Sequence, residues 1–188
     1  NGRIKFMYRR GNCLNTSLRK MLCNSLIQCH FDYACSSWCN GITKQLKSRL
    51  QTTQNKVIRF INKYDCRTSL TVSDYSNLGL LNIENRVKQY KLNYVHNILY
   101  KKCPSYLHDN FTKLVDIHCY NTRDSFAKFH VPSINSFNMT SFYCNWIKEW
   151  NHLLDSIKAI ENKHRFKKEV KRQLFNNMTE KENSINVI

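Results

Sequence analysis

The sequence predicts an all-α fold, and three observations lead to this prediction. Apolar residues recur at helical spacing over long stretches, most regularly over residues 42–63, 83–101 and 163–175. The chain has 188 residues but only 4 Gly and 2 Pro, which is poor material for folds built from many hairpin turns. Hydrophobic residues make up 41% of the composition, so the chain can build a packed core and wholesale disorder is excluded.

The first third of the chain predicts a succession of helices. Residues 2–10 are basic and aromatic, and are typical of the end of a helix that begins upstream. Asn15, Thr16 and Ser17 offer N-cap side chains, and helical spacing runs from there through Ile27. An aromatic segment follows and is broken at Gly41.

Residues 42–63 give the clearest helical pattern. The apolar stripe of this helix consists of Ile42, Leu46, Leu50, Thr53, Val57 and Ile61. One flank of the stripe carries four cations, namely Arg49, Lys56, Arg59 and Lys63. The other flank carries Lys44 and Lys47.

The middle of the chain predicts a connector and a second long helix. Residues 64–82 form the connector, which contains a short turn and offers Gly79 as a helix C-cap. The helix over residues 83–101 has a predicted inner face of Ile83, Val87, Tyr90, Tyr94 and Ile98.

The last third predicts one irregular stretch between helices. Pro104 begins a short helix that reaches Phe111, and periodicity then fails over residues 116–137. Two apolar faces with four-residue spacing follow, which are Phe142, Trp146, Trp150 and Leu154, and then Phe166, Val170 and Leu174. The second face lies in a basic helix, and we expect a frayed tail beyond Asn177.

Charge indicates the class of partner. The chain has 30 Lys+Arg against 13 Asp+Glu, a formal net charge of +17, which favours a polyanion such as nucleic acid. No apolar run has the length that a membrane span requires, so we expect no membrane partner. The chain begins with Asn1 rather than Met, and we read it as a piece of something longer.

No catalytic or metal site is predicted. Nucleotide-binding, zincin and hydrolase motifs are absent from the sequence, and no two carboxylates are spaced to hold a metal pair. The nine cysteines include no CxxC pair, and the grouping of Cys29 and His30 with Cys35 and Cys39 lacks the spacing of structural zinc sites. We therefore expect thiols in a reducing compartment and no cofactor in this chain.

Basic side chains are the candidate binding residues. The cation flank of residues 42–63 either contacts phosphates or is a solvated helix face, and the pattern leaves both open. Arg123, in the irregular stretch, either binds phosphate or holds the loop by bonding carbonyls, with the second favoured. Trp146 and Trp150 are favoured as core rather than as base-stacking residues. The basic helix near the C-terminus adds Lys167, Lys168 and Lys171.

Seven segments, in order, resemble one family. They are LCNSLIQCHFDYACSSW (22–38), LKSRLQTTQNKVIRFI (46–61), LGLLNIENR (78–86), CPSYLHDNF (103–111), YNTR (120–123), SFYCNWIKEWN (141–151) and FKKEVKRQL (166–174). The series resembles the region that follows the polymerase core in reverse transcriptases of non-LTR retrotransposons, with jockey-like elements the most similar. Each match alone is weak, but their order over nearly the whole chain is specific.

The resemblance implies the thumb and helical C-terminal extension of an RNA-directed DNA polymerase. It implies a thumb-like helical bundle over residues 1–65, a helical extension with an irregular loop over 66–177, and a tail over 178–188. The catalytic aspartates and their Mg²⁺ would belong to a palm outside this chain. The implied partners are an RNA–DNA hybrid or RNA, and the palm and fingers of the parent polymerase, in the nucleus or cytoplasm.

Alternatives to the polymerase interpretation remain open at this point. One is a stand-alone basic helical module that binds nucleic acid. The others are an inactive, poorly folding relic of a transposon and a helical protein-interaction module. Trp146 replaces a Gly of the family pattern and Leu154 replaces a Pro, so we expect an altered turn there. If the polymerase interpretation holds, we expect exposed apolar side chains around Phe6, Tyr8 and residues 18–27, where the missing domains would pack.

Overall fold

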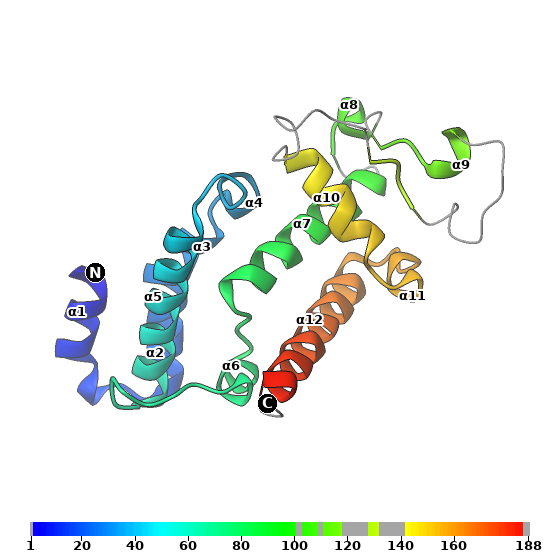
Figure 1. The fold of residues 1–188 in the computed structure, drawn as a ribbon. Helices are drawn as coiled ribbons and strands as arrows, with labels where there is room; N and C mark the ends of the chain where they lie inside the picture. The colour runs from blue at the N-terminus through cyan, green and yellow to red at the C-terminus, as the bar shows by residue number, and fades with distance from the viewer. Residues whose placement is uncertain (1, 101–102, 109–110, 118–127, 132–141, 186–188) are drawn as a thin grey trace. The chain divides into compact units, whose positions relative to one another are not determined.

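The structure is a computed structural model that describes residues 2–100, 103–108, 111–117, 128–131 and 142–185 (Figure 1). Over these residues the regular structure is helical, and extended segments pair only in an isolated antiparallel bridge between Lys113 and Phe129. The predicted all-α fold is therefore confirmed. None of the helices in these ranges combines the length and the hydropathy that crossing a bilayer requires.

The chain divides into two compact units. Unit 1 consists of residues 1–87 together with 175–188, and unit 2 consists of residues 88–174. Both boundaries fall inside helices, since the first lies in α7 (Ile83–Leu99) and the second in α12 (Lys163–Ile185). Unit 1 is thus built from two separate stretches of the sequence.

Unit 1 contains the helices predicted over residues 2–10, 16–27 and 42–63, together with short helices that were not predicted. In order they are α1 (Gly2–Arg10), η1 (Gly11–Cys13), α2 (Thr16–Cys23), η2 (Asn24–Gln28), α3 (Cys29–Asp32), α4 (Cys35–Trp38), α5 (Lys44–Asn62) and α6 (Val72–Leu78). The predicted cap at Asn15 is confirmed, because its Oδ1 accepts a 2.9 Å hydrogen bond from the amide of Leu18. Thr43 caps α5 in the same way through the amide of Leu46.

The apolar stripe predicted for α5 is buried only in the second half of the helix. Val57 and Ile61 are buried as predicted, together with Ile58. Leu46, however, is 44% exposed, and residues 44–49 are all exposed. The helical period shows which side of a helix is apolar, but it does not show how far along that side a neighbouring element extends.

Polar side chains of α5 connect this helix to the segment that leads into α7. Gln54 is fully buried, and its Nε2 donates to the carbonyl of Leu81 over 2.8 Å. Gln51 accepts through Oε1 from the amide of Ile83, which is the first residue of α7. Buried amide side chains of this kind stabilise the fold only when their hydrogen bonds are made, so they fix the position of the connector.

The connector over residues 64–82 contains α6, and the helix ends as predicted. Gly79 has φ 64°, and this left-handed conformation is the one that glycine adopts without a steric penalty at a helix C-cap. At the other end of α6, Thr71 and Asp74 form a capping box.

Unit 2 is built around aromatic side chains. Its elements are the larger part of α7, then α8 (Ser105–His108), α9 (Leu114–Ile117), α10 (Phe142–Asn151), α11 (Asp155–Lys158) and the first half of α12. The rings of Trp150 and Phe166 stack with centroids 5.8 Å apart, and Phe166 also stacks on the buried His96 at 4.1 Å. Burial of Phe166, Val170 and Leu174 is confirmed.

Two predicted apolar faces differ from the structure. Tyr90 and Tyr94 were predicted to lie on the inner face of α7, but they are 36% and 38% exposed, and Leu92 and Val95 are buried instead. A tyrosine ring can cover apolar neighbours while its hydroxyl stays in water, and Tyr94 does so by packing on Trp146 at 4.6 Å. Leu154 is 56% exposed because α10 ends at Asn151, where the helical period stops.

The predicted frayed tail is wrong as far as Ile185. Helix α12 continues from Lys163 to Ile185, and Met178 is buried. The carboxylate of Glu182 accepts hydrogen bonds of 3.2 Å from the amide of Val72, at the first turn of α6. These long-range contacts stabilise the end of α12 as a helix, although its polar composition predicts a frayed tail.

Candidate nucleic-acid interface

The four predicted cations of α5 lie on one side of the helix. At 100° per residue they fall within about 80° of each other, on one flank of the apolar stripe that contains Val57 and Ile61. Arg49, Lys56 and Lys63 are exposed, and Arg59 is half-buried. From first to last the four span about 21 Å at 1.5 Å per residue, which matches several phosphates of a duplex. We call these four residues the α5 basic face.

Two members of the α5 basic face also have structural roles. Arg59 donates through Nε to the carbonyl of Thr68 over 2.8 Å, which holds the segment after α5. Lys63 ends α5 in the left-handed conformation, with φ 59°. Substitution of Arg49 or Lys56 is therefore the better test of binding, because neither side chain bonds another residue in the part of the chain that the structure describes.

The α5 basic face lies in a part of the chain that is almost free of carboxylates. Residues 1–64 contain 12 Lys+Arg and a single acidic residue, Asp32. That carboxylate is already engaged in a two-point ion pair with the guanidinium of Arg86. Among the residues that the structure describes, no carboxylate forms an ion pair with Arg49, Lys56 or Lys63. Asp65 follows this stretch directly, and Asp74 accepts from the hydroxyl of Tyr64, so acidic residues are close to the C-terminal end of the face. Arg49 and Lys56 are nearer to the middle of the stretch without unpaired carboxylates.

The basic helix α12 presents a different set of cations from the predicted one. Lys167 and Lys168 are exposed, but Lys171 is half-buried and takes part in further interactions. The side of the helix opposite to Phe166 and Val170 carries Arg165, Lys168 and Arg172, at i, i+3 and i+7, and all three are exposed. The exposure of these three cations could have been predicted from the sequence, because the spacing of a buried apolar stripe also shows which residues lie opposite to it.

The other predicted aromatic and basic candidates have different outcomes. Trp146 and Trp150 are each 3% exposed, so their assignment to the core is confirmed. Arg123, with the rest of the YNTR segment, lies outside the described residues. Arg172 also forms an ion pair of 2.6 Å with Glu169, one turn earlier on α12.

A buried arginine was missed at the sequence level. Arg19 is 5% exposed, and its guanidinium donates to the carbonyls of Gly11, Leu14 and Phe60 over 2.7, 3.1 and 2.8 Å. It also lies 4.9 Å from the centre of the Phe60 ring. Because Phe60 is in the last turn of α5, the cation sits at the negative end of that helix dipole. Arg19 is a structural residue, and only 11 of the 12 early cations remain for binding.

Two long-range contacts in the structure involve segments of the resemblance. Asp32 of the HFDY segment pairs with Arg86 of the LGLLNIENR segment, 54 residues later in the chain. Within unit 2, Asn151 bonds both the amide and the carbonyl of Phe129, over 2.9 and 2.8 Å. Leu154, where the family pattern has Pro, has φ −61°, a value that a proline ring also adopts.

Exposed apolar side chains occur where the sequence analysis expected them. Phe6 is 62% exposed and Met21 64% exposed, and Tyr8, Leu18 and Leu26 are also exposed. Single exposed apolar residues are normal on protein surfaces, but this set falls on α1, α2 and η2 within 21 residues of sequence.

The cysteines and acidic residues form no metal or redox centre in the described part of the chain. No group of three or more His, Cys, Asp or Glu side chains there is arranged to hold a metal ion, and no disulfide is formed. Burial raises the pKa of the Cys23 thiol to about 12, against a lowering by Arg19, so this cysteine stays protonated at neutral pH.

Comparisons with known proteins give no relatives. No family model, no curated protein and no solved structure matches this chain. The functional argument therefore depends on the residues themselves and on the resemblance described above.

Proposed function

We propose that this chain binds the template–primer duplex of an RNA-directed DNA polymerase of the non-LTR retrotransposon type, as its thumb and helical C-terminal extension. The observation that carries nucleic-acid binding is the α5 basic face, a row of cations in a region with a single, already paired carboxylate. Lysine and arginine side chains of this kind contact phosphates without reading bases. The proposal therefore includes no catalytic residue and no metal ion in this chain.

The polymerase part of the proposal depends on the resemblance, and two observations support it. Asp32 and Arg86 belong to different segments of the resemblance and form one ion pair. Such a contact is expected if the segments belong to one folded unit, and it is not expected if the sequence matches are accidental. The exposed Phe6 and Met21 favour a chain that packs against further domains over a stand-alone module.

The test is the salt dependence of binding to an RNA–DNA hybrid. Log Kobs is measured against log salt concentration for the unchanged chain and for a variant with Arg49→Ala and Lys56→Ala. Each lost phosphate contact lowers the slope by about 0.9, so we expect the double variant to lose about two units. The matched control replaces Lys44 and Lys47 with Ala, which removes the same charge from the other flank of the same helix, and we expect it to change the slope by less than about one unit.

Equal loss in the two variants would mean that only total charge matters, and it would remove the α5 basic face from the proposal. A flat slope for the unchanged chain would overturn nucleic-acid binding itself. In that case the resemblance would indicate ancestry only.

A further inference from the structure

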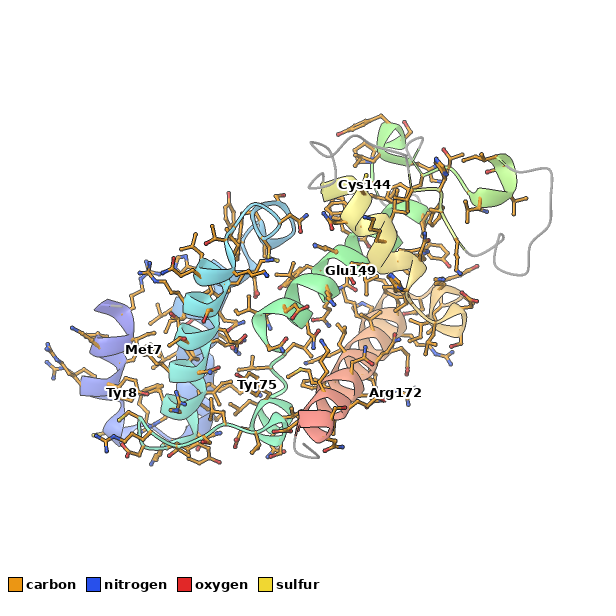
Figure 2. All side chains as sticks on the ribbon, viewed as in Figure 1. Met7, Tyr8, Tyr75, Cys144, Glu149 and Arg172 are labelled. Carbon is orange, nitrogen blue, oxygen red and sulfur yellow. The ribbon has the colours of Figure 1, made fainter. Side chains whose placement is uncertain are left out.

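Helix α1 packs beside the segment formed by α2 and η2, and the two run in opposite directions. The turn at η1 joins the end of α1 to the start of α2, and Arg3, near the start of α1, donates to the carbonyl of Leu26 in η2 over 3.1 Å. The side of α1 that meets the rest of unit 1 carries the buried Met7 and also Tyr8, whose hydroxyl donates to the carbonyl of Lys56 over 3.0 Å (Figure 2). The rotation of α1 about its own axis is therefore fixed.

The outer side of this helix pair is apolar. Phe6 is 62% exposed and lies about 60° further round α1 than Arg3, away from the buried side. On α2, Leu18 and Met21 lie about 60° apart and are 44% and 64% exposed. At 1.5 Å per residue, Phe6 and Met21 lie about 4 and 8 Å along the axes from the contact between Arg3 and Leu26, in the same direction, so they stand near the same level. We call Phe6, Leu18, Met21 and Leu26 the outer apolar face.

Arginine side chains border the outer apolar face, and the surrounding sequence has no carboxylate. Residues 1–31 contain 6 Lys+Arg and neither Asp nor Glu. Arg3 and Arg10 are exposed and lie about 60° and 40° from Phe6 on the same side of α1. Among the described residues, Arg10 forms no ion pair. This face therefore offers apolar contact and positive charge together.

This combination of charge and apolar surface favours a helix over a lipid bilayer as the partner. A helix that lies in a membrane interface keeps its cations on the face opposite to its apolar residues. Here, burial of Phe6 among acyl chains would bury the neighbouring Arg10 as well, and an unpaired buried charge is costly. A partner helix with an apolar stripe and flanking carboxylates would satisfy both features. Arg3 and Arg10 are about 10 Å apart along α1, which matches two partner carboxylates at i and i+7.

We infer that the outer apolar face binds an acidic amphipathic helix of a partner protein. The apolar stripe of that helix packs on Phe6 and Met21, and its carboxylates pair with Arg3 and Arg10. This inference goes beyond the proposed function, because the partner is a protein and the α5 basic face takes no part in binding it.

The test uses two leucines in matched positions. Leu18 and Leu46 are each 44% exposed, and each follows an N-cap residue by three positions, Asn15 on α2 and Thr43 on α5. The probe is a fluorescein-labelled helical peptide of about 20 residues, built of leucine, alanine and glutamate with leucines at i, i+3, i+4 and i+7. Its affinity is measured by fluorescence anisotropy, and circular dichroism checks that the variants keep their helix content.

We expect Leu18→Glu to weaken peptide binding about tenfold or more, because it removes apolar contact and repels the carboxylates of the peptide. Leu46→Glu adds the same charge to α5, outside the outer apolar face, and should change the affinity by about twofold or less because salt screens a distant charge. Phe6→Ala, which adds no charge, should also weaken binding. A scrambled peptide of the same composition should bind about tenfold more weakly than the probe.

Three results would overturn the inference. Equal losses in Leu18→Glu and Leu46→Glu, or equal binding of the probe and the scrambled peptide, would show that only net charge attracts the peptide. The third is a face that binds lipid: vesicles of phosphatidylserine and phosphatidylcholine would bind the unchanged chain and lose binding in Leu18→Glu, while the probe peptide would not bind. The salt slope on the RNA–DNA hybrid for the variant with Arg49→Ala and Lys56→Ala tests the proposed function separately, so either can fail without the other.

Discussion

Arg19 provides a direct test of how unit 1 is held together. The perturbation is Arg19→Ala, which removes a buried cation that joins α2 to η1 and to the last turn of α5. Because Phe60 is buried against this cation, we expect the loss of Arg19 to loosen the C-terminal half of α5 as well as α2.

The magnitude follows from the three carbonyls that Arg19 bonds. A hydrogen bond to a charged group contributes about 1.5–3 kcal/mol, so three independent bonds would sum to well above 4 kcal/mol. The carbonyls of Gly11 and Phe60, however, also accept from the amides of Leu14 and Lys63, so they are not left without a donor. We therefore expect a loss of about 3 kcal/mol, part of it from the cation–π contact with Phe60.

The assay is urea unfolding combined with amide hydrogen exchange read by mass spectrometry. Hydrogen exchange is read peptide by peptide, so it reports on the two units individually. In Arg19→Ala, peptides from α5 should lose protection while peptides from α10 should not. Arg10→Ala, at an exposed position, is the control and should stay within about 0.5 kcal/mol of the unchanged chain. If Arg19→Ala also stays within that range, the structural role assigned to this arginine is refuted.

Two further predictions concern unit 1. A Cβ at Gly11 would overlap the Phe60 ring, so we expect Gly11→Ala to destabilise the chain by about 1–3 kcal/mol in urea unfolding, and an unchanged midpoint would contradict this. Burial raises the pKa of Asp74, but hydrogen bonds from the Thr71 amide and the Tyr64 hydroxyl outweigh it and leave the pKa below its usual value. Because the folded pKa is the lower one, this stabilisation is present above about pH 4 and is lost as pH falls through the folded pKa. Unfolding measured between about pH 5 and 3 should show a smaller acid-induced loss in Tyr64→Phe than in the unchanged chain, and identical pH profiles would refute the role of that hydroxyl.

The sequence predicts the helices well because local signals specify them. Asn15 begins a helix through its own side chain and Gly79 ends one through its backbone freedom, and neither needs a distant partner. Phe166 and Val170 are buried because their four-residue spacing places them on one side of a long helix.

The features that the sequence did not predict depend on distant partners. Arg19 reads as one more surface cation, since nothing local shows that three carbonyls converge on it. The exposure of Leu154 and the helicity of the segment around Glu182 depend on where α10 ends and on the amide of Val72. Of the candidate site, the α5 basic face was predicted from spacing, whereas the structural role of Arg59 depends on the carbonyl of Thr68, nine residues later in the chain.

The discontinuity of unit 1 has a consequence for synthesis on the ribosome. Residues 1–87 leave the ribosome before residues 175–188, which complete the unit, have been made. At about 5–20 residues per second, the first stretch waits several seconds for Glu182 to reach the amide of Val72. During that interval the exposed Phe6 and Met21 offer apolar surface to which chaperones bind. A premature stop codon after α11 would remove the C-terminal stretch of unit 1 altogether.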